Sequence, residues 1–269
     1  MDLYRLFLHL VRFVVLGFAA YGRLSAGTID PHTPDSKYIE FGKKFHNVVG
    51  ISAQVKCLNP ECEFKEHKQQ GSAVVIRPHW LLTAAHVVRD GTKHTALLAD
   101  KVEQDLSHVV CHEDFDDSKF GVHDIALCYS PKEIAMEFYP PLYTKSDELG
   151  KPITFAGWGF SGTFYTGATK SDGLRRAGQN VVAGTQPSVL LCEPRRVNKF
   201  PLEFMIAPGD SGGGMFIGNE LAGINSFLLA NDGKPDGTYT DESAFTRVSL
   251  YTDWVEAQIQ AHETALQQK

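Results

Sequence analysis

The chain consists largely of short β-branched and aromatic runs separated by Gly, Pro, Asn and Asp, and this pattern constrains the fold more than any other feature. Runs of this kind predict short strands that are joined by turns. Helical periodicity is scarce before about the last twenty residues, where Tyr251, Trp254, Val255 and Ile259 fall on one face of a helix. We therefore predict an all-β protein that ends in one packed helix.

The predicted strands fall into two groups. Two prolines at 140–141 and a polar run over 145–151 separate them, and about six short strands on each side favour two small barrels over one large sheet. The first barrel is expected within 27–145, after an extended arm, and the second within 146–269 together with the helix. A hairpin predicted over 72–83 would end just before His86.

The N-terminus differs in composition from the rest of the chain. Arg5 and Arg12 precede an apolar run over 13–20, and small residues at 25–27 follow it. This order is typical of a secretory signal peptide, so residues 1–26 are predicted to be removed and the protein to be secreted, to the extracellular space or the periplasm. The alternative is an uncleaved membrane anchor or an amphipathic arm, although the interspersed basic residues suit a spanning helix poorly.

The distribution of charge argues against one class of partner. The 269 residues carry a net charge of −6, and acids and bases are scattered without a basic block. Nucleic acid is therefore not expected as a partner, and contact with a membrane is expected only if the N-terminal segment stays attached. The hydrophobic content of 43% is ordinary for a globular protein and excludes a disordered chain.

Five cysteines suit an oxidising compartment only in part, because an odd number leaves at least one unpaired within the chain. Cys57 and Cys62 are near enough in sequence to close a small loop, and Cys111 and Cys128 fall on strands that we expect to be neighbours. Cys192 is then left over. The alternative is that some or all of the cysteines are reduced and buried as small apolar residues.

The run from Pro208 to Gly214 presents one serine among glycines. Glycine permits backbone angles that bring successive N–H groups together, so the N–H groups of Gly209 and Ser211 could converge on one oxygen as an oxyanion hole. The same residue types are common in tight turns, and the loop alone does not decide between the two interpretations. A nucleophile at Ser211 needs a base and an orienting acid elsewhere in the chain.

His86 and Asp124 are the candidate partners of Ser211. A single histidine is more often a surface or core residue than a base, and an aspartate before the apolar run 125–127 can belong to a turn. The combination is more specific, because the order is His, Asp, Ser within the strings TAAH, HDIAL and GDSGG. We therefore predict His86 as a base, Asp124 as the acid that orients it and Ser211 as a nucleophile.

These strings resemble those of the trypsin/chymotrypsin-like serine protease family. The resemblance implies two six-stranded antiparallel Greek-key barrels with a C-terminal helix, and a serine endopeptidase that cleaves peptides through an acyl-enzyme without a cofactor. Segments near 35–38 and 173–182 are more similar to secreted bacterial members than to digestive enzymes. The resemblance runs from about residue 28 to the final helix, and the matching segments are 80–86, 124–127, 157–159, 209–213 and 245–255.

The same resemblance assigns Asp210 an ion pair with an α-amino group that is freed by proteolysis. The usual Ile-Val-Gly-Gly start is absent, so we place the potential free terminus at Gly27, Thr28 or Ile29. If processing there matters, additional residues before Ile29 are expected to lower activity.

Specificity is expected to differ from that of trypsin. Met205 stands where trypsin-type enzymes carry the aspartate that binds Arg or Lys, and Leu228 replaces a glycine that keeps the pocket open. We expect an apolar, shallow pocket for small or hydrophobic side chains, or one that is occluded in the free protein. The predicted substrate-binding residues are Met205, Ile206, Ser226, Phe227, Leu228 and Ser243.

Two other functions fit the same residues. A protein that keeps the fold and binds without cleaving would explain the missing activation sequence, whereas retention of all three triad residue types argues against it. An esterase could use the same triad, because the nucleophile attacks esters as well as amides. A metal site is not expected, since His108, His112 and His123 lack a closed ligand set.

Overall fold

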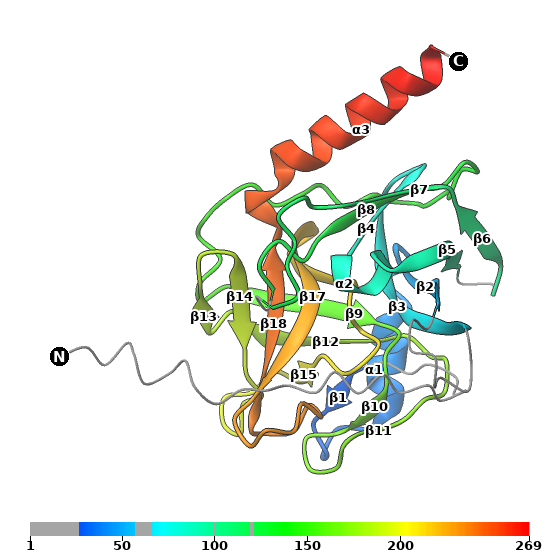
Figure 1. The fold of residues 1–269 in the computed structure, drawn as a ribbon. Helices are drawn as coiled ribbons and strands as arrows, with labels where there is room; N and C mark the ends of the chain where they lie inside the picture. Colours follow the sequence, from blue (N-terminus) through cyan, green and yellow to red (C-terminus); the bar gives the residue numbers. More distant parts are fainter. Residues whose placement is uncertain (1–26, 57–65, 99–100, 119–120, 269) are drawn as a thin grey trace.

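Two antiparallel sheets form most of the protein (Figure 1). The structure is a computed structural model that describes residues 27–268 except 57–65, 99–100 and 119–120. The predicted signal peptide and the loop between Cys57 and Cys62 therefore lie outside the described residues. The first sheet contains, in spatial order, β6 (Glu103–Leu106), β5 (Gly91–Leu97), β2 (Val48–Lys56), β3 (Glu66–Arg77), β4 (Trp80–Thr83), β8 (Ala126–Tyr129) and β7 (His108–Cys111).

The second half of the chain forms the second large sheet, and a small mixed sheet joins it to the start of the described chain. The second sheet contains β12 (Arg176–Val181), β9 (Pro152–Gly157), β16 (Gly214–Ile217), β17 (Glu220–Ala230), β18 (Asp241–Arg247), β14 (Val189–Cys192) and β13 (Gly184–Thr185). The small sheet contains β11 (Gly167–Lys170), β10 (Ser161–Thr163), β1 (Thr28–Ile29) and β15 (Phe204–Met205).

Each large sheet curls upon itself. Its two edge strands are consecutive in the chain, β6 and β7 in the first sheet and β12 and β13 in the second, and a short link between the edges requires a curled sheet. The predicted all-β fold with two barrel-like halves is confirmed. The described sheets have seven strands rather than six. In the first sheet, β6 and β7 are separated at Ser107, which donates its N–H to the Tyr129 carbonyl (3.0 Å) on β8.

The N-terminal arm, which was expected to be extended, forms the helix α1 (Asp35–Gly42) in its second half. Tyr38 on this helix is fully buried and stacks on Phe204, with 6.0 Å between the ring centroids. The first residue of the helix pairs with Arg176 (2.6 Å), whose side chain is only 1% exposed. Contacts with the small sheet and the second sheet thus stabilise a helix that local sequence does not favour.

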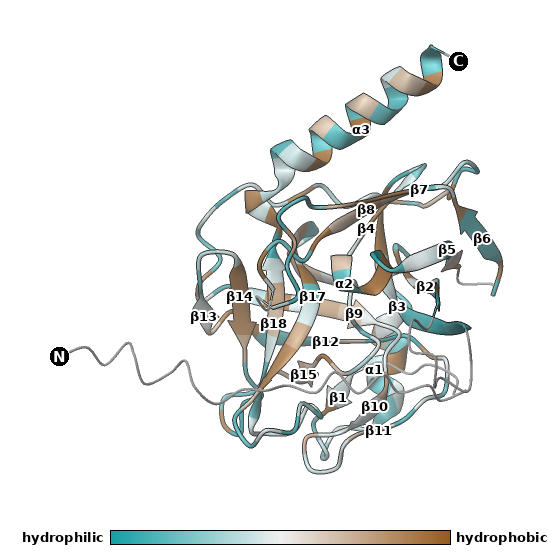
Figure 2. Ribbon diagram, viewed as in Figure 1, coloured by the Kyte–Doolittle hydropathy of each residue, from teal (hydrophilic) through white to brown (hydrophobic). Residues whose placement is uncertain are grey.

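The C-terminal helix is confirmed as α3 (Thr252–Gln267). Val255 and Ile259 are buried in the same core cluster as Trp80 of β4, whereas Leu266 near the far end is 44% exposed. The helix accordingly runs away from the body (Figure 1), and its outer part alternates hydrophilic and hydrophobic residues, in contrast to the apolar strand β14 (Figure 2). None of the helices within the described residues is long and apolar enough to cross a membrane.

The polar segment between the two halves is held by a buried carboxylate. Glu148 is fully buried and accepts hydrogen bonds from Nε (2.8 Å) and one terminal nitrogen (2.6 Å) of Arg247, and from the Ser249 hydroxyl (3.0 Å). This contact ties the segment to the end of β18. The predicted boundary at 145–146 stays a prediction.

The three described cysteines form no disulfide. Cys111 and Cys128 do lie on the neighbouring strands β7 and β8, but the register pairs Cys111 with Ala126 and Cys128 with Val109. The two cysteines are therefore diagonal neighbours, which lie roughly 7 to 8 Å apart in such a pair, and a disulfide needs Cα atoms within about 7 Å. The expected Cys111–Cys128 bridge is wrong, and Cys192 is likewise free and buried.

Candidate active site

His86 and Asp124 lie close together because one follows and the other precedes two neighbouring antiparallel strands of the first sheet. His86 lies on the single turn α2 (Ala85–Val88), just after β4, and Asp124 lies two residues before β8. β4 and β8 pair antiparallel with Thr83 opposite Ala126. Asp124 accepts a hydrogen bond from the His86 backbone N–H at Oδ1 (2.9 Å), and its Oδ2 lies 2.8 Å from His86 Nδ1.

The second half of the chain braces this pair. The Ser226 hydroxyl donates to Asp124 Oδ2 (2.5 Å), and the Thr246 hydroxyl donates to the Asp124 carbonyl (2.9 Å). The pairing of β17 with β18 shifts register between Asn225 and Phe227, which sets Ser226 apart from the regular ladder. Sequence reasoning placed Ser226 on the substrate strand but missed its bond to the carboxylate, for which a serine within a strand gives no signal.

Burial and charge oppose each other in this pair. Burial alone would raise the pKa of Asp124, but the positive charge of His86 and the hydrogen bonds from His86 and Ser226 hold that pKa below its usual value. Burial alone would lower the pKa of His86, but the Asp124 carboxylate raises it above the usual 6.5. The pair therefore favours an ionised carboxylate that stabilises an imidazolium, while the His86 side chain keeps 32% exposure to solvent.

The conformation of the loop that carries Ser211 depends on two glycines and on hydrogen bonds from the first sheet. Gly209 and Gly212 have φ angles of 90° and 87°, which favour glycine. Ser72 of β3 donates its N–H to the Ser211 carbonyl (2.7 Å) and its hydroxyl to the Gly209 carbonyl (3.1 Å). Within the described residues, the N–H groups of Gly209 and Ser211 donate to no acceptor, so they remain available to a ligand oxygen.

Ser226 also fixes the side chain of Ser211. The Ser211 hydroxyl donates to the Ser226 carbonyl (3.3 Å) rather than to the His86 ring. Ser226 of β17 therefore contacts Asp124 with its hydroxyl and Ser211 with its carbonyl. These two contacts place Ser211 beside the His86–Asp124 pair. The three residues predicted as a triad are brought together, but the hydrogen bond between Ser211 and His86 is not formed in this conformation.

Asp210 is fully buried behind the loop. Its carboxylate accepts hydrogen bonds from the N–H groups of Gly159 (2.8 Å) and Ala207 (2.8 Å), and from that of Gly27. Burial raises the pKa of Asp210 to about 7, although these three donors and the charge of Arg176 act in the opposite direction. A Cβ at Gly159 would overlap the backbone of Asp210, which explains the glycine at that position.

Several of the predicted pocket residues lie where the end of β15, in the small sheet, meets β18 of the second sheet. The Ser243 hydroxyl donates to the Met205 sulfur (3.3 Å) and accepts from the Ile206 N–H (3.1 Å). Leu228 lies opposite Ser243 on the neighbouring strand, and Phe227 lies opposite Ala244. Met205, Ile206 and Ser243 are buried, so the space behind the serine loop is filled by packed side chains.

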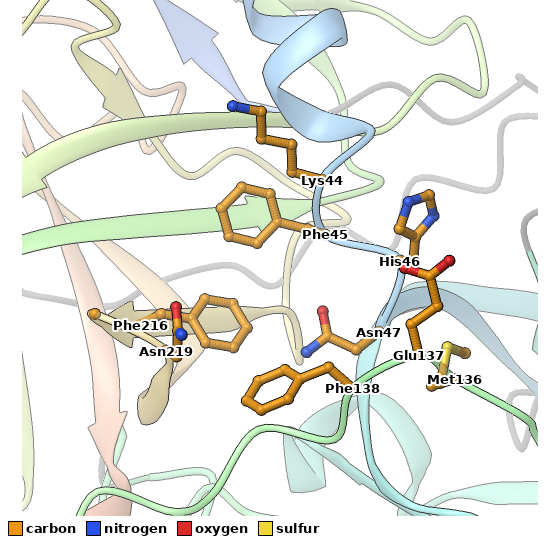
Figure 3. Close-up of a pocket in the computed structure, with 10 residues that line it drawn as sticks. Lys44, Phe45, His46, Asn47, Met136, Glu137, Phe138, Phe216 and Asn219 are labelled. Atoms are coloured by element: carbon orange, nitrogen blue, oxygen red, sulfur yellow. The ribbon is translucent and has the colours of Figure 1, made fainter.

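Two pairs of stacked histidines and one cavity contain no member of the predicted triad, although His123 directly precedes Asp124. His108 stacks on His262 of α3, with 4.3 Å between ring centroids, whereas His112 stacks on His123. A cavity of about 160 Å³ is lined by residues that include Phe45, Phe138 and Phe216, whose rings surround it (Figure 3). None of the predicted site residues lines this cavity.

A two-barrel β fold that sets a buried His–Asp pair beside a glycine-flanked serine is the architecture of the chymotrypsin-like serine proteases. The family model described as Trypsin matches residues 54–255. The chain therefore belongs to the trypsin family of serine proteases.

Individual relatives agree with this assignment. Serine protease SP24D of Anopheles gambiae is 27% identical over 205 residues, which cover 68% of this chain and 69% of the relative. A protein described as collagenase, from Hypoderma lineatum, is 28% identical over 204 residues, which cover 68% of this chain and 73% of the relative. These relatives come from insects, so the predicted similarity to bacterial members gains no support.

Solved structures share the fold. Neuropsin, a serine protease expressed in mouse brain, aligns with a TM-score of 0.62 at 16% identity and covers 81% of this chain and 96% of its own. The HL collagenase structure aligns with a TM-score of 0.60 at 21% identity and covers 80% of this chain and 94% of its own.

Proposed function

We propose that this protein is a secreted serine endopeptidase in which Ser211 is the nucleophile, His86 the general base and Asp124 the acid that orients the base. The observation that carries the proposal is the position of His86. Its backbone N–H and its ring Nδ1 both contact the Asp124 carboxylate, while the His86 side chain stays partly exposed to solvent. A buried carboxylate in this arrangement fixes the tautomer of the ring and stabilises its charged form.

The reaction follows from these positions. The Ser211 hydroxyl leaves the Ser226 carbonyl by rotation of the side chain, gives its proton to His86 Nε2 and attacks the acyl carbon. The N–H groups of Gly209 and Ser211 stabilise the resulting oxyanion, each by about 3 kcal/mol. His86 then protonates the leaving amine, and a water that His86 deprotonates hydrolyses the acyl-enzyme. Asp124 stays ionised throughout.

The substrates that fit best are peptides with a small or hydrophobic residue before the cleaved bond. Met205 stands where trypsin-type enzymes carry the aspartate that binds Arg or Lys, and Ser243, the candidate for the opposite wall of the pocket, contacts the Met205 sulfur. Neither residue supplies a charge for Arg or Lys. The packed side chains support a shallow pocket, or one that opens when a substrate binds.

Asp210 is proposed to pair with a new α-amino group at Gly27. The N–H of Gly27 already donates to the Asp210 carboxylate, and β1 holds the next two residues between β10 and β15. Cleavage before Gly27 would turn this neutral donor into an ammonium without moving the chain. Removal of a signal peptide over 1–26 would perform that cleavage.

A second candidate is a protein that binds peptides without cleaving them. It is favoured by the bond between Ser211 and the Ser226 carbonyl and by the packed pocket. An esterase is chemically equivalent to the peptidase up to the leaving group, so a comparison of rates on matched ester and peptide substrates separates the two.

Labelling with a serine-directed fluorophosphonate tests the proposal. Protein that begins at Gly27 is expected to be labelled once per chain and to cleave an apolar peptide library, and Ser211→Ala is expected to lose both properties. Ser107→Ala is the matched control, because Ser107 is exposed and distant from the serine loop in sequence. Folded protein that begins at Gly27 but takes no label would favour the binding protein.

A further inference from the structure

A cleft of about 770 Å³ lies beside the start of α3. His112, Asp114 and His123 line it, and each offers a ligand atom within 4.8 Å of the other two. His123 precedes β8, and the other two follow β7. The antiparallel pairing of these strands brings the three side chains together, which spacing along the sequence does not reveal.

The three ligand atoms lie within 4.8 Å of one another, so binding of a common ion requires rearrangement of the side chains. A tetrahedral Zn²⁺ site with bonds of about 2.0 to 2.1 Å needs neighbouring ligand atoms roughly 3.3 Å apart. The rings of His112 and His123 now stack, with 4.6 Å between centroids and 14° between planes, and parallel rings do not point their lone pairs at one ion. Rotation of the rings about their Cβ–Cγ bonds, with movement of the exposed Asp114, is therefore required.

The charge of the cleft suits a cation. The Glu113 carboxylate accepts a hydrogen bond from Trp254 Nε1 (3.1 Å) and lies 4.0 Å from His112 Nδ1. Asp114 adds a second carboxylate, and among the described residues that line the cleft none is Lys or Arg. In the present orientation of the ring, the Tyr251 hydroxyl lies 3.2 Å from His123 Nδ1, so a partner for one ring nitrogen is at hand.

The backbone gives an independent reason to assign a role to His123. Its φ angle is 56°, a left-handed conformation that a residue other than glycine adopts at a cost of about 1 to 3 kcal/mol. With this backbone, the ring lies in the cleft against His112 and Tyr251. Asparagine adopts this backbone conformation more readily than most residues. The variant His123→Asn would therefore keep the backbone conformation and remove only the imidazole.

We propose that this cleft binds one divalent transition-metal ion of the Zn²⁺ class through the imidazoles of His112 and His123 and the carboxylate of Asp114. The fourth position is open to water. The sequence argued against a metal because the spacing of His108, His112 and His123 lacks a closed ligand set. In the structure His108 lies against α3, apart from the other two.

The test measures binding directly and does not depend on hydrolysis. Full-length protein that is freed of metal with a chelator is titrated with Zn²⁺ in a calorimeter, and one ion per chain is expected to bind with a dissociation constant of about 10 μM or lower. His123→Asn and Asp114→Asn are each expected to weaken binding at least tenfold, and His112→Ala is expected to abolish it. His67→Ala, which removes an exposed histidine from β3, is the matched control and is expected to bind as the unaltered protein does.

Titration with Co²⁺ separates this site from the cysteines. A tetrahedral cobalt spectrum without a sulfur-to-metal charge-transfer band is expected, because the three proposed ligands are nitrogen and oxygen. Absence of binding at 100 μM Zn²⁺ would overturn the proposal, and so would unchanged binding in His123→Asn or a thiolate band with Co²⁺. Asp114→Asn keeps the size of an exposed side chain, so the test survives if His112→Ala does not fold.

Discussion

The buried carboxylate of Asp210 makes the N-terminal cleavage measurable as a change in stability. In the chain that continues before Gly27, only neutral N–H groups face this carboxylate directly, and its pKa is about 7 instead of the usual 3.8. At 1.36 kcal/mol per pKa unit, the difference corresponds to roughly 4 kcal/mol. A chain that begins at Gly27 presents an ammonium instead, which lowers the pKa of Asp210 and removes most of this difference.

The sign of the effect follows from proton binding. With a raised pKa, folded protein holds the Asp210 proton more tightly than unfolded protein does. The stability that this proton provides is fully present below about pH 4 and is lost as the pH rises to about 7. The extended chain is therefore expected to lose roughly 4 kcal/mol of unfolding free energy over this range, relative to the chain that begins at Gly27.

Urea unfolding of both forms at intervals from about pH 4 to 8 measures this difference. Asp210→Asn in the extended chain is the control, because it removes the titrating group while its side chain keeps nearly the same size. Activity toward a peptide at neutral pH is expected to be higher for the form that begins at Gly27. Identical pH dependence of stability in the two forms, or an unchanged dependence in Asp210→Asn, would refute the reasoning.

The remaining predictions concern His86, Glu148 and Leu228. Although burial opposes it, Asp124 raises the pKa of His86, so hydrolysis is expected to increase with pH through a value above 6.5, and a flat pH–rate profile would contradict this. Glu148→Gln breaks a buried ion pair and is expected to lower the free energy of unfolding, measured in urea, by about 3 kcal/mol. Glu40→Gln breaks an exposed ion pair and is expected to lower it by less than about 0.5 kcal/mol. Leu228→Gly is expected to raise the ratio of kcat/KM for peptides with a large apolar residue before the cleaved bond to kcat/KM for peptides with alanine there. An unchanged ratio would show that Leu228 does not close the substrate pocket.

The strands were predictable from sequence because their residues carry local information. The hairpin expected over 72–83 appears as β3 and β4, and four consecutive buried residues of β4 lead directly to His86. The helix α3 was predicted from the spacing of Val255 and Ile259, which are buried as expected. The apolar runs and the turn between them predict the hairpin, and the hydrophobic period predicts the helix.

Other features depend on contacts between distant segments, and local sequence does not contain them. The helix α1 forms where Tyr38 packs on Phe204, far away in the chain. The expected bridge between Cys111 and Cys128 failed because neighbouring strands permit a disulfide only in a suitable register. The stacking of His112 on His123 was missed for a similar reason, since it depends on how β7 pairs with β8.

The candidate site belongs to neither half of the protein alone. The first sheet supplies His86 and Asp124, but Asp124 is held from the second sheet by Ser226. The loop of Ser211 belongs to the second half, yet Ser72 of β3 fixes two of its carbonyls. Each half therefore lacks hydrogen bonds that only the other provides.

This reciprocal support has a physical consequence for the triad residues. A buried carboxylate needs donors to remain an ion, and for Asp124 the Ser226 hydroxyl on β17 adds a hydrogen bond to the larger contribution of His86. The serine loop likewise keeps the N–H groups of Gly209 and Ser211 available only while Ser72 holds its carbonyls. Separation of the halves would remove in one step the hydrogen bonds that hold Asp124 from the second sheet and those by which Ser72 shapes the serine loop. Docking of the two sheets is thus itself a requirement for the proposed chemistry.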